Sequence, residues 1–139
     1  MKAVATFSVR DFKATGLSPV PAIATALPVS VSTMEKRYSG EIEGRSATIF
    51  TAAFDQASGT GCYLAMESFE GTVNGREGSF NFVHSAATTG SDRTNEVFRI
   101  VDGSGTGDLA GISGSGGIEI DPDGTHRIRL DYRLGSEST

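Results

Sequence analysis

The stretch CYLAMESFEGTVNGREGSFNFVHS, residues 62–85, places two runs of strand-forming residues on either side of Asn74-Gly75. An Asn-Gly pair between alternating apolar residues is a strong signal for a two-residue hairpin turn. With these residues at the centre of the turn, Val73 lies opposite Arg76, and every other facing pair follows from that one. The stretch therefore predicts an antiparallel hairpin whose register is set by its turn.

This register divides the hairpin into two faces, because successive side chains of a strand point to opposite sides. One face is far more aromatic, so we expect it to point inward. That face carries Tyr63, Ala65, Glu67, Phe69, Gly71, Val73, Gly78, Phe80, Phe82 and His84. It makes Glu67 and His84 diagonal neighbours, roughly 7 Å apart at the backbone.

A Glu67–His84 pair in an apolar interior has two interpretations. It is a proton-transfer couple, or it is a buried pair that satisfies its own hydrogen bonds and fixes the register. Lys36 is a possible third member of this group. It lies in the expected strand 29–38, where Met34, Lys36 and Tyr38 share one face. If that face is the inner one, Lys36 is a candidate partner for Glu67; if it is the outer one, Lys36 is an ordinary surface residue.

Strand patterns continue through the rest of the chain, with almost no helical periodicity. The expected strands are residues 3–10, 29–38, 45–54, 62–73, 76–85, 94–101, part of the glycine-rich run up to 120, and 126–134. In the last of these the apolar residues alternate inward, so Tyr132 brings a hydroxyl group into the interior. About eight regularly spaced strands indicate a single all-β domain over residues 1–139, built as a barrel or a sandwich.

Two segments fall outside the strand pattern. Residues 13–28 contain three prolines and no charge after Lys13, which favours a packed apolar loop. Such a loop is either a lid or plug over the interior, or a surface excursion that covers one end of the barrel. The tail, residues 135–139, is expected to be frayed.

The composition of the chain limits which binding partners and cofactors we expect. The formal net charge of −5 argues against nucleic acid and against anionic membrane surfaces. Cys62 is the one cysteine and cannot form an internal disulfide, which fits a cytoplasmic protein. No run is apolar enough to span a bilayer. His84 and His126 are the only histidines, and no spacing predicts a metal site or a bound cofactor.

Four pieces of the chain resemble a known family. They are KRYSGEIEG (36–44), MESFEGTVNGREGSFNFVHS (66–85), VDGSGTGDLAGISGSGG (101–117) and RLDYRL (129–134). Together they resemble a family of small, largely uncharacterised bacterial proteins with an allene oxide cyclase-like barrel. The resemblance implies a closed eight-stranded antiparallel β-barrel with a central cavity. The glycines of 103–117 are then expected to form a turn and a strand of minimal side chains that leaves room inside.

By analogy at the level of fold, the resemblance implies a cofactor-free cyclase or isomerase acting on an apolar, polyketide- or oxylipin-like small molecule. The expected catalytic residues are Glu67, His84, Tyr63 and Tyr132. The expected ligand-binding residues are Met34, Lys36, Tyr38, Phe69, Phe80, Phe82 and Phe98. Two alternatives stand beside it: a barrel that only binds or carries a hydrophobic ligand, and a filled barrel that acts through its surface or as a homo-oligomer.

Overall fold

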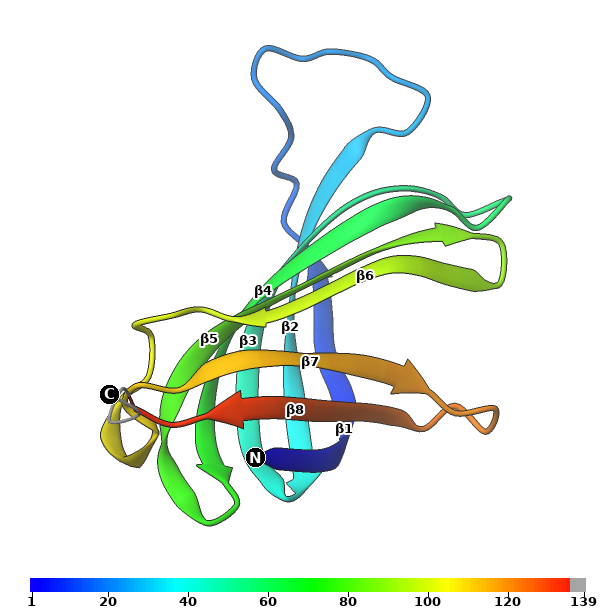
Figure 1. Cartoon of the computed structure of the whole chain (residues 1–139). Helices are drawn as coiled ribbons and strands as arrows, with labels where there is room; N and C mark the ends of the chain where they lie inside the picture. The colour runs from blue at the N-terminus through cyan, green and yellow to red at the C-terminus, as the bar shows by residue number, and fades with distance from the viewer. Residues whose placement is uncertain (136–139) are drawn as a thin grey trace.

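The computed structural model describes residues 1–135, and its only helix is the 3₁₀ turn η1 (Gly107–Leu109). Everything else regular is β-strand (Figure 1). The strands are β1 (Lys2–Ala14), β2 (Val29–Gly40), β3 (Ile42–Asp55), β4 (Thr60–Val73), β5 (Arg76–Thr89), β6 (Asp92–Ile100), β7 (Ser113–Ile120) and β8 (His126–Arg133). All eight expected strands are present. The expected fraying of 135–139 concerns residues 136–139, which lie outside the described residues.

The eight strands form a closed antiparallel ring. Each strand pairs with the next along the chain, and β1 pairs with β8 to close it. Pairing is extensive except between β6 and β7, which share one paired position, Arg99 with Ser115. At one end, β3 to β6 extend beyond the rest of the ring (Figure 1), and we call this the flared end. No helix within residues 1–135 has the length and apolar character needed to cross a bilayer.

The hairpin of β4 and β5 has the register expected from its turn. Val73 pairs with Arg76, Glu67 pairs with Phe82, and Ala65 pairs with His84. The aromatic face points inward, because Glu67 and His84 are only 0% and 3% exposed. The face assignment and the register of residues 62–85 are therefore confirmed.

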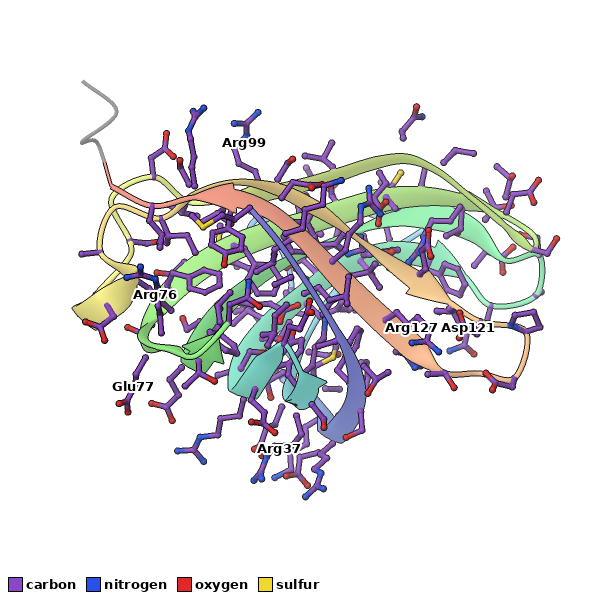
Figure 2. The ribbon with its side chains drawn as sticks, turned by 60° about the horizontal axis from the view of Figure 1, so that its bottom comes forward. Arg37, Arg76, Glu77, Arg99, Asp121 and Arg127 are labelled. Atoms are coloured by element: carbon purple, nitrogen blue, oxygen red, sulfur yellow. The ribbon has the colours of Figure 1, made fainter. Side chains whose placement is uncertain are left out.

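The inside of the ring is filled by apolar side chains over much of its length. Charged side chains such as Arg37, Glu77 and Arg99 point outward (Figure 2), where water solvates them. Burial of this core is the main favourable term for folding. The core residues are Ala3, Ala5, Phe7, Tyr38, Ile42, Phe69, Val73, Phe80, Phe82, Phe98, Ile100, Leu109, Ile112, Ile118, Ile128, Leu130 and Tyr132.

Residues 15–28 do not form the packed loop that their prolines favour. They join β1 to β2 and project away from the ring at the flared end (Figure 1). Leu17, Val20 and Ile23 are 65%, 94% and 71% exposed. The segment therefore neither plugs the ring nor closes over it, and we call it the arm.

The glycine-rich run also differs from expectation. Leu109 and Ile112 are fully buried and anchor the segment before β7, as expected. The glycines of β7, however, leave no empty space. A Cβ on Gly116 would lie 3.1 Å from the ring of Phe98, and one on Gly117 would lie 2.6 Å from the guanidinium of Arg129. Neighbouring atoms, including the Arg129 carbonyl oxygen at 2.2 Å from a Cβ on Gly116, thus occupy the room that the missing Cβ atoms leave.

The approach of β3 to β4 requires glycine at one crossing, where Gly44 pairs with Gly71. The two residues have φ of +144° and +152°. A Cβ on Gly71 would lie 2.0 Å from the carbonyl oxygen of Glu43, which is closer than any non-bonded contact. Both backbone angle and space therefore exclude a side chain at this point.

We predict that Gly71→Ala lowers the free energy of unfolding by about 2–4 kcal/mol, because a strained φ and a backbone clash add together. Gly103→Ala is the matched control, since Gly103 has φ of +84° and a Cβ added there would have nothing within 4 Å. It carries only the penalty of the backbone angle. Urea denaturation measures both, and an equal loss in the two variants would contradict the clash.

Candidate functional site

The buried polar residues lie together on the inner face of four adjacent strands. Within the described chain, the buried residues with polar or charged side chains are Ser32, Lys36, Ser46, Thr48, Glu67 and His84. They belong to β2, β3, β4 and β5, on the faces that alternate toward the ring's interior. Burying a polar group is unfavourable unless it is hydrogen-bonded, so their partners decide what this region can do.

Glu67 is the centre of this group, and both of its carboxylate oxygens are occupied. Oε2 accepts a hydrogen bond from Lys36 Nζ at 2.5 Å. Oε1 accepts bonds from Ser46 Oγ at 2.7 Å and from Tyr38 Oη at 2.9 Å. Lys36 and Tyr38 lie on β2, Ser46 on β3 and Glu67 on β4. The inner-face interpretation of Lys36 is therefore correct, and Lys36 pairs with Glu67.

Further contacts hold Lys36 and Tyr38 in place around Glu67. The Lys36 ammonium also lies 5.0 Å from the ring centroid of Phe7, a cation–π contact. Burial, together with the charge of Glu67, raises the pKa of Tyr38 well above its usual range, so the phenol stays protonated and donates. The Glu67 carboxylate accepts bonds from one cation and two hydroxyl groups, so it fixes the positions of its neighbours and is a structural group.

The expected Glu67–His84 couple does not form, because each residue has other partners. His84 Nε2 lies 2.7 Å from Oε2 of Glu96 on β6. Burial lowers the pKa of His84, against the opposing effect of the Glu96 carboxylate. Although burial raises the pKa of Glu96, its bonds from the Ile118 backbone and from His84 lower it on balance. The neutral imidazole therefore donates Nε2–H to ionised Glu96, which leaves the lone pair on Nδ1.

Glu96 and Arg93 also complete the sparse β6–β7 seam. The Ile118 N–H donates to Glu96 Oε2 at 3.0 Å, and the Ile118 carbonyl accepts from the Arg93 guanidinium. Side chains thus replace backbone ladder bonds there. Glu96 was not predicted from the sequence, although its alternation with Phe98 and Ile100 could have found it. Ser46 and Thr48 were missed because no face had been assigned to residues 45–54.

Aromatic side chains lie next to the polar group on the side of the flared end. Tyr63 stacks on Phe50 with ring centroids 5.3 Å apart, and Phe12 contacts Phe50 at 6.2 Å. Met34 pairs with Thr48 across β2 and β3, and is half-buried. The Thr48 hydroxyl is buried and has no hydrogen-bond partner within residues 1–135. A fully buried hydroxyl without a partner is unfavourable and needs an explanation.

The other predicted site residues are separated from this region. Tyr132 is buried but lies near the opposite end, where Asn74 Nδ2 donates to its hydroxyl at 2.7 Å. It does not join Glu67 or His84. The four predicted phenylalanines pack into the core: Phe69 contacts Phe80 at 5.2 Å, and Phe82 stacks on Phe98 at 4.7 Å.

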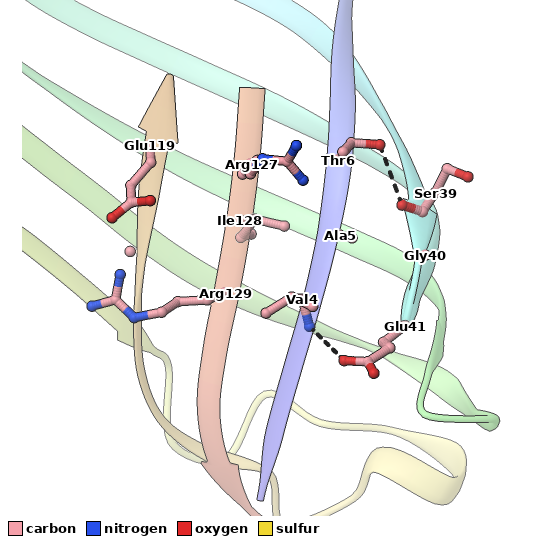
Figure 3. Close-up of a pocket in the computed structure, with 11 residues that line it drawn as sticks. Val4, Ala5, Thr6, Ser39, Gly40, Glu41, Glu119, Arg127, Ile128 and Arg129 are labelled. Carbon is pink, nitrogen blue, oxygen red and sulfur yellow. Dashed lines mark hydrogen bonds between the residues drawn. The ribbon is translucent and has the colours of Figure 1, made fainter. Parts of the chain in front are cut away.

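A hollow of about 420 Å³ lies on the outside of the ring across β1, β2, β7 and β8 (Figure 3). Two of its charged residues have partners: Glu41 accepts from the Val4 N–H at 2.9 Å, and Arg127 donates to Asp121 at 2.7 Å. None of the site residues predicted from the sequence lines this hollow. It is therefore a surface feature separate from the polar group inside the ring.

Fold and site together define a class of small all-β protein, in which strands close into a ring around a buried lysine–glutamate pair. Within that class, the chain belongs to the DUF3224 family, described as a protein of unknown function, whose model matches residues 3–132. It is similar to the crystal structure of a DUF3224 protein with unknown function from Shewanella oneidensis MR-1. The two share 25% identity over 98% of each chain, with a TM-score of 0.82. No curated protein matches the chain.

We predict that Lys36→Met and Glu67→Gln each destabilise the protein, by about 3–5 kcal/mol where an uncompensated buried charge remains. The double variant Lys36→Met/Glu67→Gln removes both charges and should lose much less than the sum of the two. Urea denaturation of the four proteins gives the coupling energy. Strict additivity would show that the two groups do not depend on one another.

Proposed function

We propose that this chain binds an apolar small molecule at the flared end, and that its ring is a closed barrel with an allene oxide cyclase-like fold and a ligand space above the Lys36–Glu67 pair. The partnerless hydroxyl of Thr48 carries the proposal. It faces inward on β3, two residues from Phe50 and therefore on the same side as that ring. A ligand with one polar group could bond to Thr48 while Phe50 and Tyr63 contact its apolar part.

The exposure of the aromatic groups supports this position. Two further aromatic side chains of β1 and β3, Phe12 and Phe54, are 59% and 45% exposed. A ligand at the flared end would cover part of this exposed aromatic surface. Binding sites for small molecules combine apolar walls with a few placed polar groups. Glu67 has a different role in this proposal. Its oxygens already accept three hydrogen bonds, so it holds Lys36, Tyr38 and Ser46 below the ligand and does not contact the ligand itself.

The fluorescent probe N-phenyl-1-naphthylamine tests this site. We expect saturable binding that Phe50→Ala weakens about tenfold, a loss of about 1.4 kcal/mol, which is within the range of an aromatic contact. Ile49→Ala is the matched control, because Ile49 is the neighbouring residue on the opposite face of β3 and is 56% exposed. Weakening by Ile49→Ala but not by Phe50→Ala would place the probe outside the ring.

The His84–Glu96 pair favours a second candidate function, a cofactor-free isomerase or cyclase. The free Nδ1 lone pair of His84 is a base, and Glu96 stabilises the imidazolium that forms when it accepts a proton. In an isomerisation, His84 would take a proton from one carbon of the ligand and return it to another. The ring of His84 lies 5.6 Å from that of Tyr63, beside the proposed ligand position.

Deuterium exchange separates catalysis from simple binding. We expect ligand that co-purifies with the protein from its own host, identified by native mass spectrometry, to gain carbon-bound deuterium in D₂O when it is bound to the wild type. His84→Ala should bind the same ligand and lose the exchange. A bound ligand that exchanges no carbon-bound hydrogen in the wild type would contradict catalysis and support a carrier.

A further inference from the structure

The outer face of the flared end is apolar and exposed. Ile49, Met66 and Val83 are direct neighbours across β3, β4 and β5. With their neighbours they form what we call the apolar outer face: Val29, Val31, Ile49, Ala53, Cys62, Leu64, Met66, Val83 and Val97. Ile49, Leu64 and Met66 are 56%, 48% and 44% exposed. Contiguous exposed apolar surface of this kind marks interaction sites.

This face differs from the rest of the ring's exterior. Nearer the opposite end, the outward side chains of the same strands are charged and paired, as in Arg45 with Glu70 and Arg37 with Glu35. A hollow of about 440 Å³ lies at this face; its lining includes Val29, Thr51, Ala53, Cys62 and Leu64, together with Tyr63 from the neighbouring inner face. None of the members of the apolar outer face is charged, and Arg99, which pairs with Val83 across β5 and β6, borders it on the β6 side.

The arm, residues 15–28, is a second exposed apolar surface at the same end. It carries no charged residue, and Val20 is 94% exposed. At its base, Thr15 is tied to β2 by bonds from its N–H and its hydroxyl to the Val31 carbonyl, at 2.9 and 2.8 Å. Beyond that base it projects from the molecule (Figure 1). Its apolar side chains are therefore presented outward, away from the core of their own ring.

We infer that the protein forms a two-fold dimer in which the arm of each copy lies on the apolar outer face of the other. Each copy then supplies both surfaces, as a two-fold interface requires. The arm and the apolar outer face are chemically complementary, because both consist of uncharged, mainly apolar residues and both lose contact with water when they meet. Size matches too: the arm and the face together contribute about 20–30 residues a side, as standard interfaces do.

Mass in solution is the first test. We expect light scattering to give twice the 14.5 kDa of one chain at micromolar concentration. Ile23→Lys in the arm and Met66→Lys in the face should each give monomers. Ile120→Lys is the matched control, because Ile120 is 55% exposed but lies on β7, outside both surfaces. Monomeric wild type, or a dimer that survives Ile23→Lys, would overturn the inference.

Cys62 supplies the second test, because it is the one cysteine and lies on the apolar outer face. A tagged Ile23→Cys/Cys62→Ser variant is mixed with the wild type and treated with a short bismaleimide. We expect a covalent pair of one tagged and one untagged chain, joined between position 23 and Cys62. The single variant Ile23→Cys keeps Cys62, and a cross-link confined to one chain of that variant would show that the arm lies on its own outer face and would overturn the dimer.

The two sites are tested independently. Phe50→Ala lies on the inner face of β3 and should leave the dimer intact while it weakens probe binding. Ile23→Lys should abolish the dimer while the protein still binds the probe. If Ile23→Lys removed both, the arm would belong to the ligand site of its own chain, and the inference of an arm exchanged between copies would be wrong.

Discussion

The arrangement of the interior depends on the buried Lys36–Glu67 pair. A carboxylate with no exposed surface is costly unless it is paired and fully hydrogen-bonded. Its donors come from β2 and β3 while Glu67 itself lies on β4. A shift of one residue in any of these strands would turn a partner to the outside. The pair and its hydroxyl donors therefore stabilise one relative register of β2, β3 and β4. In any other register, a buried charge would be left without its partner.

The pair also divides the inside of the ring into two parts. Toward the opposite end the space is filled by the apolar core, where Tyr132 bonds to Asn74. Thr48 lies beside Glu67, its partner across β3 and β4, while His84 and the aromatic side chains of Phe50 and Tyr63 lie toward the flared end. A ligand that enters at the flared end would meet His84, Phe50 and Tyr63 before it reaches Thr48 and the saturated Glu67. This division is why we assign ligand contact to Thr48 and proton transfer to His84, and a supporting role to Glu67.

Local patterns predicted the strands and the inner face of the hairpin, because a two-residue turn sets every pair in β4 and β5. Partners across the ring were harder to predict. The role of Lys36 could be predicted only once the inward face of β2 was known. The contact of Glu96 with His84 depends on the register of β6 against β5, which a bulge near Ser85 shifts. Tyr132 does point inward, but its level along the ring depends on the stagger of β8 against β1. The prolines of the arm restrict its backbone without specifying what it packs against.

The three methionines test the central claim, because they lie in three different places: Met34 beside Thr48, Met66 on the apolar outer face, and Met1 just before β1, near Tyr132. The measurement is ¹³C-methyl NMR of the methionine-labelled protein during titration with N-phenyl-1-naphthylamine. If the ligand binds above the Lys36–Glu67 pair, the Met34 methyl signal shifts and gives intermolecular NOEs, while the Met66 and Met1 signals do not. Shifts and NOEs at Met66 with an unchanged Met34 signal would contradict the account.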